Sequence, residues 1–134
     1  MPYHGYEDYF EKPLVLTVAT TGGLHGKEAN PNLPTQPEEV ALDLAACEEA
    51  GASMVHLHAR DANDEDTKDV ARFQALRDAI DDHCDDIVVN FTTGGGGLYS
   101  REARIAPVLE TDPRPEVATI DLGPINFGQT RTAE

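Results

Sequence analysis

Four short apolar segments alternate with longer segments of helical character along this chain. The apolar segments, at 14–20, 54–59, 87–92 and 117–122, are typical of strands buried on both faces. Their starts lie 40, 33 and 30 residues apart, which is the spacing of strand–helix units. The sequence therefore predicts a parallel sheet with right-handed crossover helices. An open doubly wound sheet and part of a closed (β/α)8 barrel both fit, and the periodicity does not decide between them.

The segments between these strands have the signals of amphipathic helices. Thr35–Glu38 has the form of a capping box at the start of the first helix. A helix from Arg101 to about Leu109 is capped by Ser100. The middle helix has four apolar residues on its inner face, at Val70, Phe73, Leu76 and Ile80.

The chain is strongly acidic, with 25 Asp and Glu residues against 10 Lys and Arg, a formal net charge of −15. This balance argues against nucleic-acid binding through phosphate neutralisation. Self-repulsion at such a charge destabilises a compact state unless salt screens it. An acidic partner-binding face is the other interpretation. Because the acids are spread along the sequence, we favour a salt-adapted surface, as in halophiles.

Apart from its charge, the chain has the ordinary apolar content of a globular protein, and we expect it to be cytoplasmic. No apolar run approaches the ~20 residues of a membrane span. The first residues lack the basic start and apolar stretch of a signal peptide. Cys47 and Cys84 are too few for a disulfide scaffold, and we expect two reduced thiols.

His56 and His58 lie one residue apart at the end of the second predicted strand. Side chains alternate faces along a strand, so both imidazoles point to the same side. Neutral imidazoles about 7 Å apart along a strand can converge on one divalent cation, and zinc is the natural candidate. The alternative is a pair of histidines bonded to backbone groups in a polar mouth. We favour the metal site.

Polar and glycine-rich residues follow every predicted strand. Ligands of parallel α/β proteins sit at the carboxyl ends of the strands, so we expect one polar mouth built from the strand ends, at 20–23, 56–61, 90–95 and 121–127. The turn at 92–97 offers hydroxyls and bare N–H groups suited to a carboxylate or phosphate, although a flexible turn without a ligand is the alternative.

Two further side chains near this mouth have open interpretations. Arg60 could contact an anion, but we favour the interpretation that it forms an ion pair with Asp61 and so fixes the loop. His25 could reach the mouth, although a solvated loop histidine is more common. Nothing is assigned to His4 or His83.

Several of these motifs together resemble the β-keto acid cleavage enzymes, whose type member is the 3-keto-5-aminohexanoate cleavage enzyme. The resemblance runs from about residue 14 to 128 through motifs in the same order, at Thr21–Gly22, Asn30–Pro34, His56–Asp61, Asn90–Gly95 and Asp121–Phe127. It implies a (β/α)8 barrel with zinc at the top. It further implies cleavage of a β-keto acid with acetyl-CoA, to give acetoacetate and a new acyl-CoA.

The resemblance also implies roles for particular residues. His56 and His58 match the two zinc-binding histidines. Thr92 and Gly95 match positions that hold the substrate carboxylate, and Thr119 matches another substrate-contacting hydroxyl. One departure is the stretch Thr21–His25, which lacks the acidic residue that some members carry there, so the residue that would contact the far end of the substrate is undefined.

A second departure is the absence of the family's third zinc ligand and its catalytic arginine and aspartate, which lie in the second half of the barrel. A catalytic zinc normally has three protein ligands. We therefore interpret residues 14–134 as the N-terminal half of a TIM barrel, with four parallel strands and crossover helices, preceded by an extension at 1–13. We expect a homo-oligomer or a complex with a complementary C-terminal chain, because a half barrel leaves open sheet edges. The alternatives are a non-catalytic fragment that needs a partner chain and another metal-dependent barrel, such as an amidohydrolase.

Overall fold

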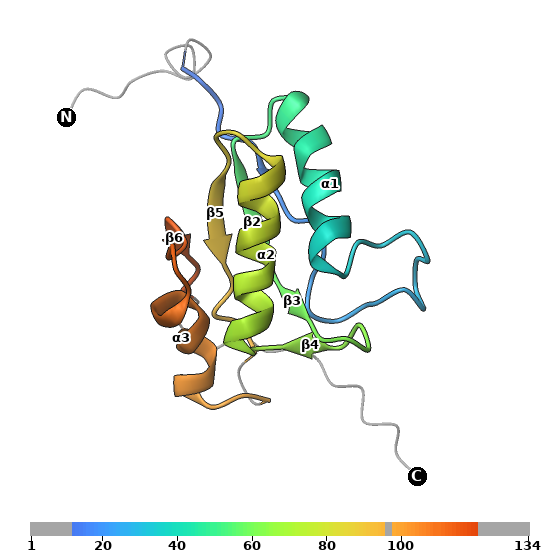
Figure 1. Cartoon of the computed structure of the whole chain (residues 1–134), viewed down its shortest axis with the longest axis vertical. Coiled ribbons are helices and arrows are strands. Elements are labelled where there is room, and N and C mark those ends of the chain that lie inside the picture. The colour runs from blue at the N-terminus through green and yellow to red at the C-terminus, as the bar shows by residue number, and fades with distance from the viewer. Residues whose placement is uncertain (1–11, 96–97, 121–134) are drawn as a thin grey trace, which may run out of the picture.

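The structure, a computed structural model, describes residues 12–95 and 98–120 (Figure 1). Four parallel strands form one sheet: β1 (Thr17–Val18), β2 (Met54–Leu57), β5 (Val88–Phe91) and β6 (Val117–Ala118). They lie side by side in the order in which the chain makes them. A doubly wound sheet reverses its strand order at a switch point, whereas a (β/α)8 barrel does not. The strand order therefore decides for an α/β fold built as the N-terminal half of a barrel.

Three helices connect the strands: α1 (Pro37–Glu49), α2 (Val70–His83) and α3 (Arg101–Glu110). Figure 1 shows α1 and α2 side by side over one face of β2 and β5. The core lies between these layers, where the Phe73 and Phe91 rings pack with centroids 4.8 Å apart. Alternation along the strands places Val55 and Leu57 in this core. Their neighbours along the strand therefore point to the other face of the sheet.

That other face carries the polar side chains. In the parallel register, His56 of β2 lies opposite Asn90 of β5. His56 is only half-buried, and Leu14, Val15 and Ile120 at the sheet margins are exposed by 80, 63 and 75 %. Helices α1 and α2 lie over the opposite face of β2 and β5 (Figure 1).

Several predicted boundaries shift. The strand predicted at 54–59 leaves the sheet at His58. The chain then forms a hairpin between β3 (Ala59–Arg60) and β4 (Asp66–Thr67), for which the sequence has no alternating pattern. The capping box is one residue later than predicted: Gln36 is the N-cap and Glu39 the N3 residue of α1. Ser100 caps α3 as predicted, by accepting a hydrogen bond from the Ala103 N–H at 3.1 Å.

Some predictions fall outside the described residues. These include the end of the fourth strand with the motif at 121–127, nearly all of the extension at 1–13, and positions 96–97 of the glycine turn. None of the described helices is long and apolar enough to span a membrane.

Candidate functional site

The two histidines predicted to share a site lie together at the carboxyl end of β2. The ring centroids of His56 and His58 are 5.2 Å apart, and the ring planes are nearly perpendicular, at 82°. His58 lies just beyond the last residue of β2, yet its ring still lies beside that of His56. The two imidazoles therefore lie next to each other in the structure.

His56 is oriented by the neighbouring strand. Its Nδ1 lies 3.3 Å from the amide oxygen of Asn90, its register partner on β5. When the Asn90 amide oxygen accepts from this nitrogen, the hydrogen lies on Nδ1. In a neutral imidazole the lone pair is then on Nε2, the form in which a histidine can bind a metal ion.

His58 has a charged neighbour at the same ring position. Its Nδ1 lies 3.6 Å from Oδ1 of Asp66 in β4, an electrostatic contact longer than a hydrogen bond. Among the described residues, this buried Nδ1 has no hydrogen-bond partner. Each imidazole therefore has an oxygen facing Nδ1, a neutral amide in one case and a carboxylate in the other.

Asp66 belongs to a buried ion pair. Its Oδ2 lies 3.3 Å from Nζ of Lys68, whose side chain is only 2 % exposed. Burial raises the pKa of the Asp66 carboxyl, but the contacts with His58 and Lys68 outweigh it, so this pKa lies below its ordinary value. Burial lowers the pKa of the Lys68 ammonium, and Asp66 offsets only part of this effect.

The glycine turn after β5 adjoins these residues. Thr92 is buried, and its hydroxyl accepts a hydrogen bond from the Gly94 N–H at 3.0 Å. Gly95 has a φ of +107°, a conformation that favours glycine. A Cβ at Gly95 would also lie 2.9 Å from the ring of Tyr99, so the turn has no room for a side chain there.

Thr119 is joined to the same turn through Thr93. Its hydroxyl accepts from the Thr93 N–H at 3.2 Å, and its carbonyl accepts from the Thr93 hydroxyl at 2.6 Å. A hydroxyl that accepts a hydrogen bond still carries its own O–H donor. Thr92, Gly95 and Thr119, the three residues matched to substrate contacts, therefore belong to one connected region.

Arg60 is held differently from either sequence interpretation. It is 4 % exposed, and its guanidinium donates to the backbone carbonyls of Gly22, His25 and Asp64, with Nη2 to His25 at 2.7 Å and Nη1 to Asp64 at 3.1 Å. No ion pair with Asp61 is found in the part of the chain that the structure describes. Arg60 therefore fixes the β1–α1 loop to the hairpin, and we call this set of three bonds the Arg60 clamp. His25 contributes its carbonyl, while its side chain is exposed.

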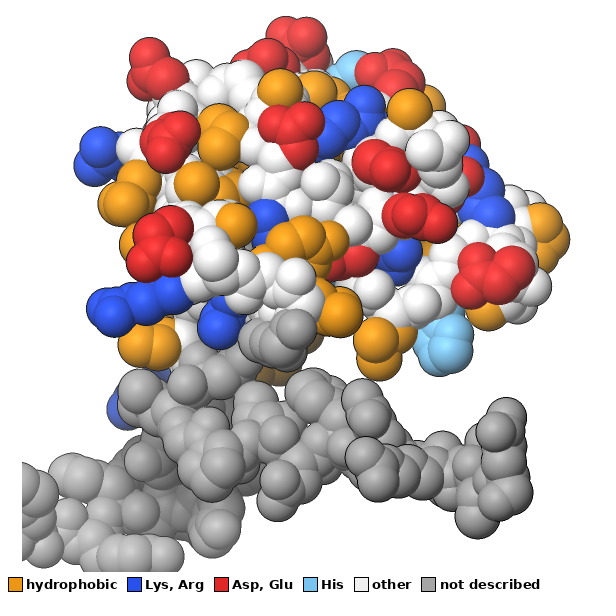
Figure 2. Space-filling view, turned by 90° about the horizontal axis from the view of Figure 1, so that it is seen from below, with side chains coloured by type: hydrophobic (Ala, Val, Ile, Leu, Met, Phe, Trp, Pro, Cys, Tyr) orange, Lys and Arg blue, Asp and Glu red, His pale blue; other side chains and the backbone are white. Residues whose placement is uncertain are grey.

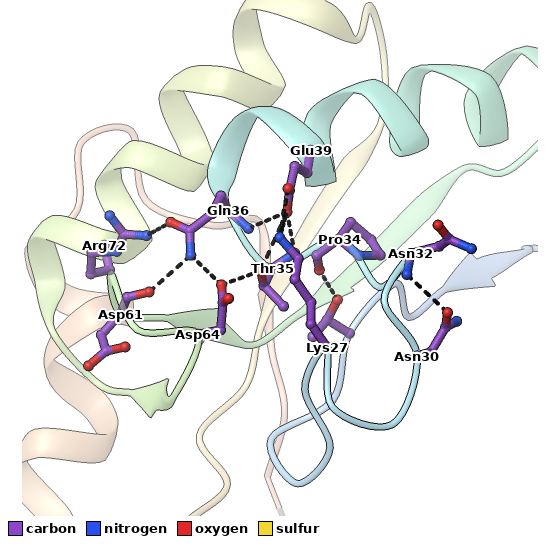
Figure 3. Close-up of polar contacts among 11 residues, drawn as sticks. Lys27, Asn30, Asn32, Pro34, Thr35, Gln36, Glu39, Asp61, Asp64 and Arg72 are labelled. Atoms are coloured by element: carbon purple, nitrogen blue, oxygen red, sulfur yellow. Dashed lines mark hydrogen bonds and ion pairs between the residues drawn. The ribbon is translucent and has the colours of Figure 1, made fainter.

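A second polar network fixes the start of α1 to the same hairpin (Figure 3). The Gln36 side-chain amide donates to the Asp61 carbonyl at 3.0 Å and to Oδ1 of Asp64 at 2.6 Å, and its Oε1 accepts from Arg72 at 2.5 Å. Hydrogen bonds from Thr35 and Gln36 lower the pKa of Asp64. Asp64 itself has a φ of +67°. The network and the Arg60 clamp hold the loops that surround the histidines.

The described residues contain no group of three or more His, Cys, Asp or Glu side chains placed to hold a metal ion. Two imidazoles are therefore the ligands that this part of the chain offers. Asp66 lies at Nδ1 of His58, a different side of the ring from Nε2.

A family model for the beta-keto acid cleavage enzymes matches residues 13–133. The chain belongs to this family. It is 37 % identical over 115 residues to the 3-keto-5-aminohexanoate cleavage enzyme of Acetoanaerobium sticklandii, a match that covers 86 % of the chain and 41 % of the relative. It is 36 % identical over 119 residues to the 3,5-dioxohexanoate:acetyl-CoA acetone transferase of Paraburkholderia graminis, covering 88 % of the chain and 37 % of the relative.

A solved structure shares the fold of this β-keto acid cleavage family member. The ternary complex of ObcA with C4-CoA adduct and oxalate superimposes with a TM-score of 0.59 at 22 % identity, over 67 % of this chain and 23 % of that one. The chain spans about two fifths of the length of the curated relatives it matches. The family match gives no support to the amidohydrolase alternative.

Sequence reasoning missed Asp66 and Lys68 in this family member. Asp66 ends an acidic stretch at 61–66 and Lys68 follows it, and such a stretch is typical of a solvent-exposed loop. A usable signal was present, because Lys68 is one of only three lysines in a chain with 25 acidic residues. A rare cation just before a helix start can be a buried partner of one of these acids.

Proposed function

We propose that this chain provides the zinc-binding and carboxylate-binding part of a β-keto acid cleavage enzyme. In the proposed reaction, a β-keto acid and acetyl-CoA give acetoacetate and a new acyl-CoA. The observation that carries the proposal is the pair of imidazoles whose centroids lie 5.2 Å apart at the strand ends, each with an oxygen at Nδ1. Relatives named as acetyl-CoA-dependent transferases support the substrate class.

His56 and His58 would hold the metal ion. An oxygen lies near Nδ1 of each ring, from Asn90 at 3.3 Å and from Asp66 at 3.6 Å, and this supports the proposal because zinc-bound histidines usually have such an oxygen on the far side of the ring. A bound zinc ion would supply Lewis-acid chemistry, drawing charge from the keto group. Thr92, Gly95 and Thr119 would bind the substrate carboxylate and fix its orientation, because the hydroxyls and the turn offer donors beside the histidines.

We propose that a third metal ligand and the acid–base groups come from residues corresponding to the remainder of the longer relatives, on the same or on a second polypeptide. A catalytic zinc normally has three protein ligands, and the described residues offer two. The exposed Leu14, Val15 and Ile120 at the sheet margins are apolar surface that such a second part would cover. A second copy of the chain is the other candidate, as a homo-oligomer.

We also propose a cytoplasmic location and a salt-adapted surface. Cys47 and Cys84 are both free thiols, as is usual in a reducing compartment. Figure 2, which views the molecule from the carboxyl-end side of the strands, has acidic side chains distributed over the visible surface rather than gathered in one patch. This distribution supports salt adaptation over a dedicated acidic docking face.

The experiment is a metal count on untagged, purified protein by inductively coupled plasma mass spectrometry, followed by zinc titration. We expect His56→Ala and His58→Ala to lose the bound ion. His83→Ala is the matched control, because His83 contacts the Ala79 carbonyl and Glu38 on the helices and should leave zinc binding unchanged. Native protein that contains no metal and takes up none on titration would refute the proposal.

A further inference from the structure

A buried charged pair lies directly behind His58. Oδ1 of Asp66 is 3.6 Å from Nδ1 of His58 and 3.4 Å from Nζ of Lys68, and Oδ2 is 3.3 Å from the same ammonium. The side chains of Lys68 and Asp66 are 2 % and 16 % exposed. Removing two charges from water carries a large desolvation cost, and such a pair is weak evidence for a role in stability. Because the pair lies against the His58 imidazole, it is placed to orient that ring.

Asp66 is fixed from its backbone as well as from its side chain. Its carbonyl accepts a hydrogen bond from the Tyr99 hydroxyl at 2.6 Å. The Lys68 ammonium lies 5.3 Å from the centroid of the Tyr99 ring, within the range of a cation–π contact. Tyr99 therefore restrains both members of the ion pair.

Two glycines provide the space for this arrangement. A Cβ at Gly23 would lie 3.0 Å from Nδ1 of His58 and 3.1 Å from Oδ1 of Asp66, so a side chain there would crowd the contact. A Cβ at Gly95 would lie 2.9 Å from the Tyr99 ring and 3.2 Å from Cε of Lys68. Loops from β1 and β5 thus both close around the same group.

We propose that Asp66, fixed by Lys68 and Tyr99, is a positioning residue for His58: its carboxylate keeps the hydrogen on Nδ1 and thereby directs Nε2 toward the cation shared with His56. The inference rests on the proposed zinc site. Asn90 acts on His56 in the same way with a neutral oxygen. An anionic partner makes an imidazole a more basic ligand than a neutral one does, so His58 is the stronger donor of the two.

The first test needs no metal. Long-range 1H–15N correlation spectra of the metal-free chain at about pH 8.5, where a histidine of ordinary pKa near 6.5 is neutral, report which ring nitrogen carries the hydrogen. We expect His58 to carry it on Nδ1 in the wild type and to shift toward the Nε2–H form in Asp66→Ala. Glu65→Ala is the matched control, because it removes an exposed carboxylate from the adjacent position of the same hairpin. A predominant Nε2–H form of His58 in the wild type overturns the proposal.

The second test measures zinc affinity by competition with a chromophoric chelator. We expect Asp66→Ala to bind zinc about 10- to 100-fold more weakly, the usual effect of removing such a partner, and Glu65→Ala to bind it as the wild type does. If Asp66→Ala does not fold, the double variant Asp66→Leu with Lys68→Met is used instead. It leaves no acceptor at Nδ1 of His58 and no unpaired buried charge, so the same changes are expected in the same direction.

The outcomes separate this inference from the proposed function. Equal zinc affinity in wild type and Asp66→Ala overturns the positioning role while the zinc site stands. If the wild type binds no zinc, the proposed function fails, and the tautomer of His58 in the metal-free variants still decides whether Asp66 positions the ring.

Discussion

Replacing Arg60 by methionine should destabilise the protein by about 2–4 kcal/mol. The Arg60 clamp consists of three hydrogen bonds from a charged donor to the carbonyls of Gly22, His25 and Asp64. Bonds of this kind are each worth about 1.5–3 kcal/mol. Gly22 and His25 are exposed, so their carbonyls regain water when the guanidinium is lost, and the net effect is smaller than three full bonds.

Arg60→Lys tests whether the geometry matters beyond the charge. An ammonium lacks the planar fork of five donors, so we expect it to recover only part of the lost stability. The assay is urea denaturation followed by far-UV circular dichroism. Arg101→Met is the matched control, because Arg101 is exposed on α3 and its loss should cost no more than about 0.5 kcal/mol.

The clamp should also influence zinc binding, because Gly22 precedes Gly23, which lies against Nδ1 of His58. We expect Arg60→Met to weaken zinc binding in the same chelator competition. Arg60→Lys with wild-type stability, or Arg60→Met that is no less stable than Arg101→Met, would refute the clamp.

Three other measurements test the fold and the charge balance. Phe73→Ala should cost about 3–5 kcal/mol in urea denaturation, since its ring is fully buried against Phe91; a cost below about 1 kcal/mol would contradict the packing of α2 on β5. The pKa of Glu39 is lowered to about 2 by Lys27 and by the N–H groups of Thr35 and Gln36. A carboxyl whose pKa falls on folding stabilises the protein above its unfolded pKa, here about 4.5, and this contribution is lost as the pH falls toward 2. Glu39→Gln should therefore be less stable than the wild type at pH 7 and equally stable near pH 2, and a constant difference would contradict the assignment. At a formal net charge of −15, the urea midpoint should rise between about 0.1 and 1 M KCl as the Debye length falls from about 10 to 3 Å; a flat or falling midpoint would count against salt adaptation.

Much of the fold followed from local patterns. Apolar periodicity predicted four inner residues of α2: Phe73, Leu76 and Ile80 are buried, whereas Val70 at its start is only half-buried. It could not choose between an open sheet and a barrel, because the two differ in how the strands are ordered beside one another and in whether helices cover one or both faces of the sheet. The observed order of β1, β2, β5 and β6 is a property of the assembled sheet.

Local patterns were less reliable at boundaries. Thr35–Glu38 fits the usual Thr-x-x-Glu form of a capping box, whereas glutamine is not a usual N-cap residue, so the sequence predicted only the earlier position. The structure selects Gln36 and Glu39, because Thr35 instead contacts Asp64 of the hairpin. The predicted ion pair between Arg60 and Asp61 was wrong because it considered only neighbours in the sequence. The carbonyls that accept from Nη2 of Arg60 lie 35 and 38 residues away along the chain.

The sequence by itself predicted that His56 and His58 lie on one side of a strand, because strand alternation is a local property of the backbone. The two rings do lie together, although β2 ends at Leu57. The sequence could not determine what faces Nδ1 of each ring. The oxygen beside His56 belongs to a residue 34 positions later, brought there by strand pairing. The carboxylate beside His58 belongs to Asp66, which the β3–β4 hairpin brings there, and no periodic pattern in the sequence predicts that hairpin. Which oxygen faces Nδ1 of each imidazole is therefore decided by tertiary packing, since only packing brings these oxygens to the rings.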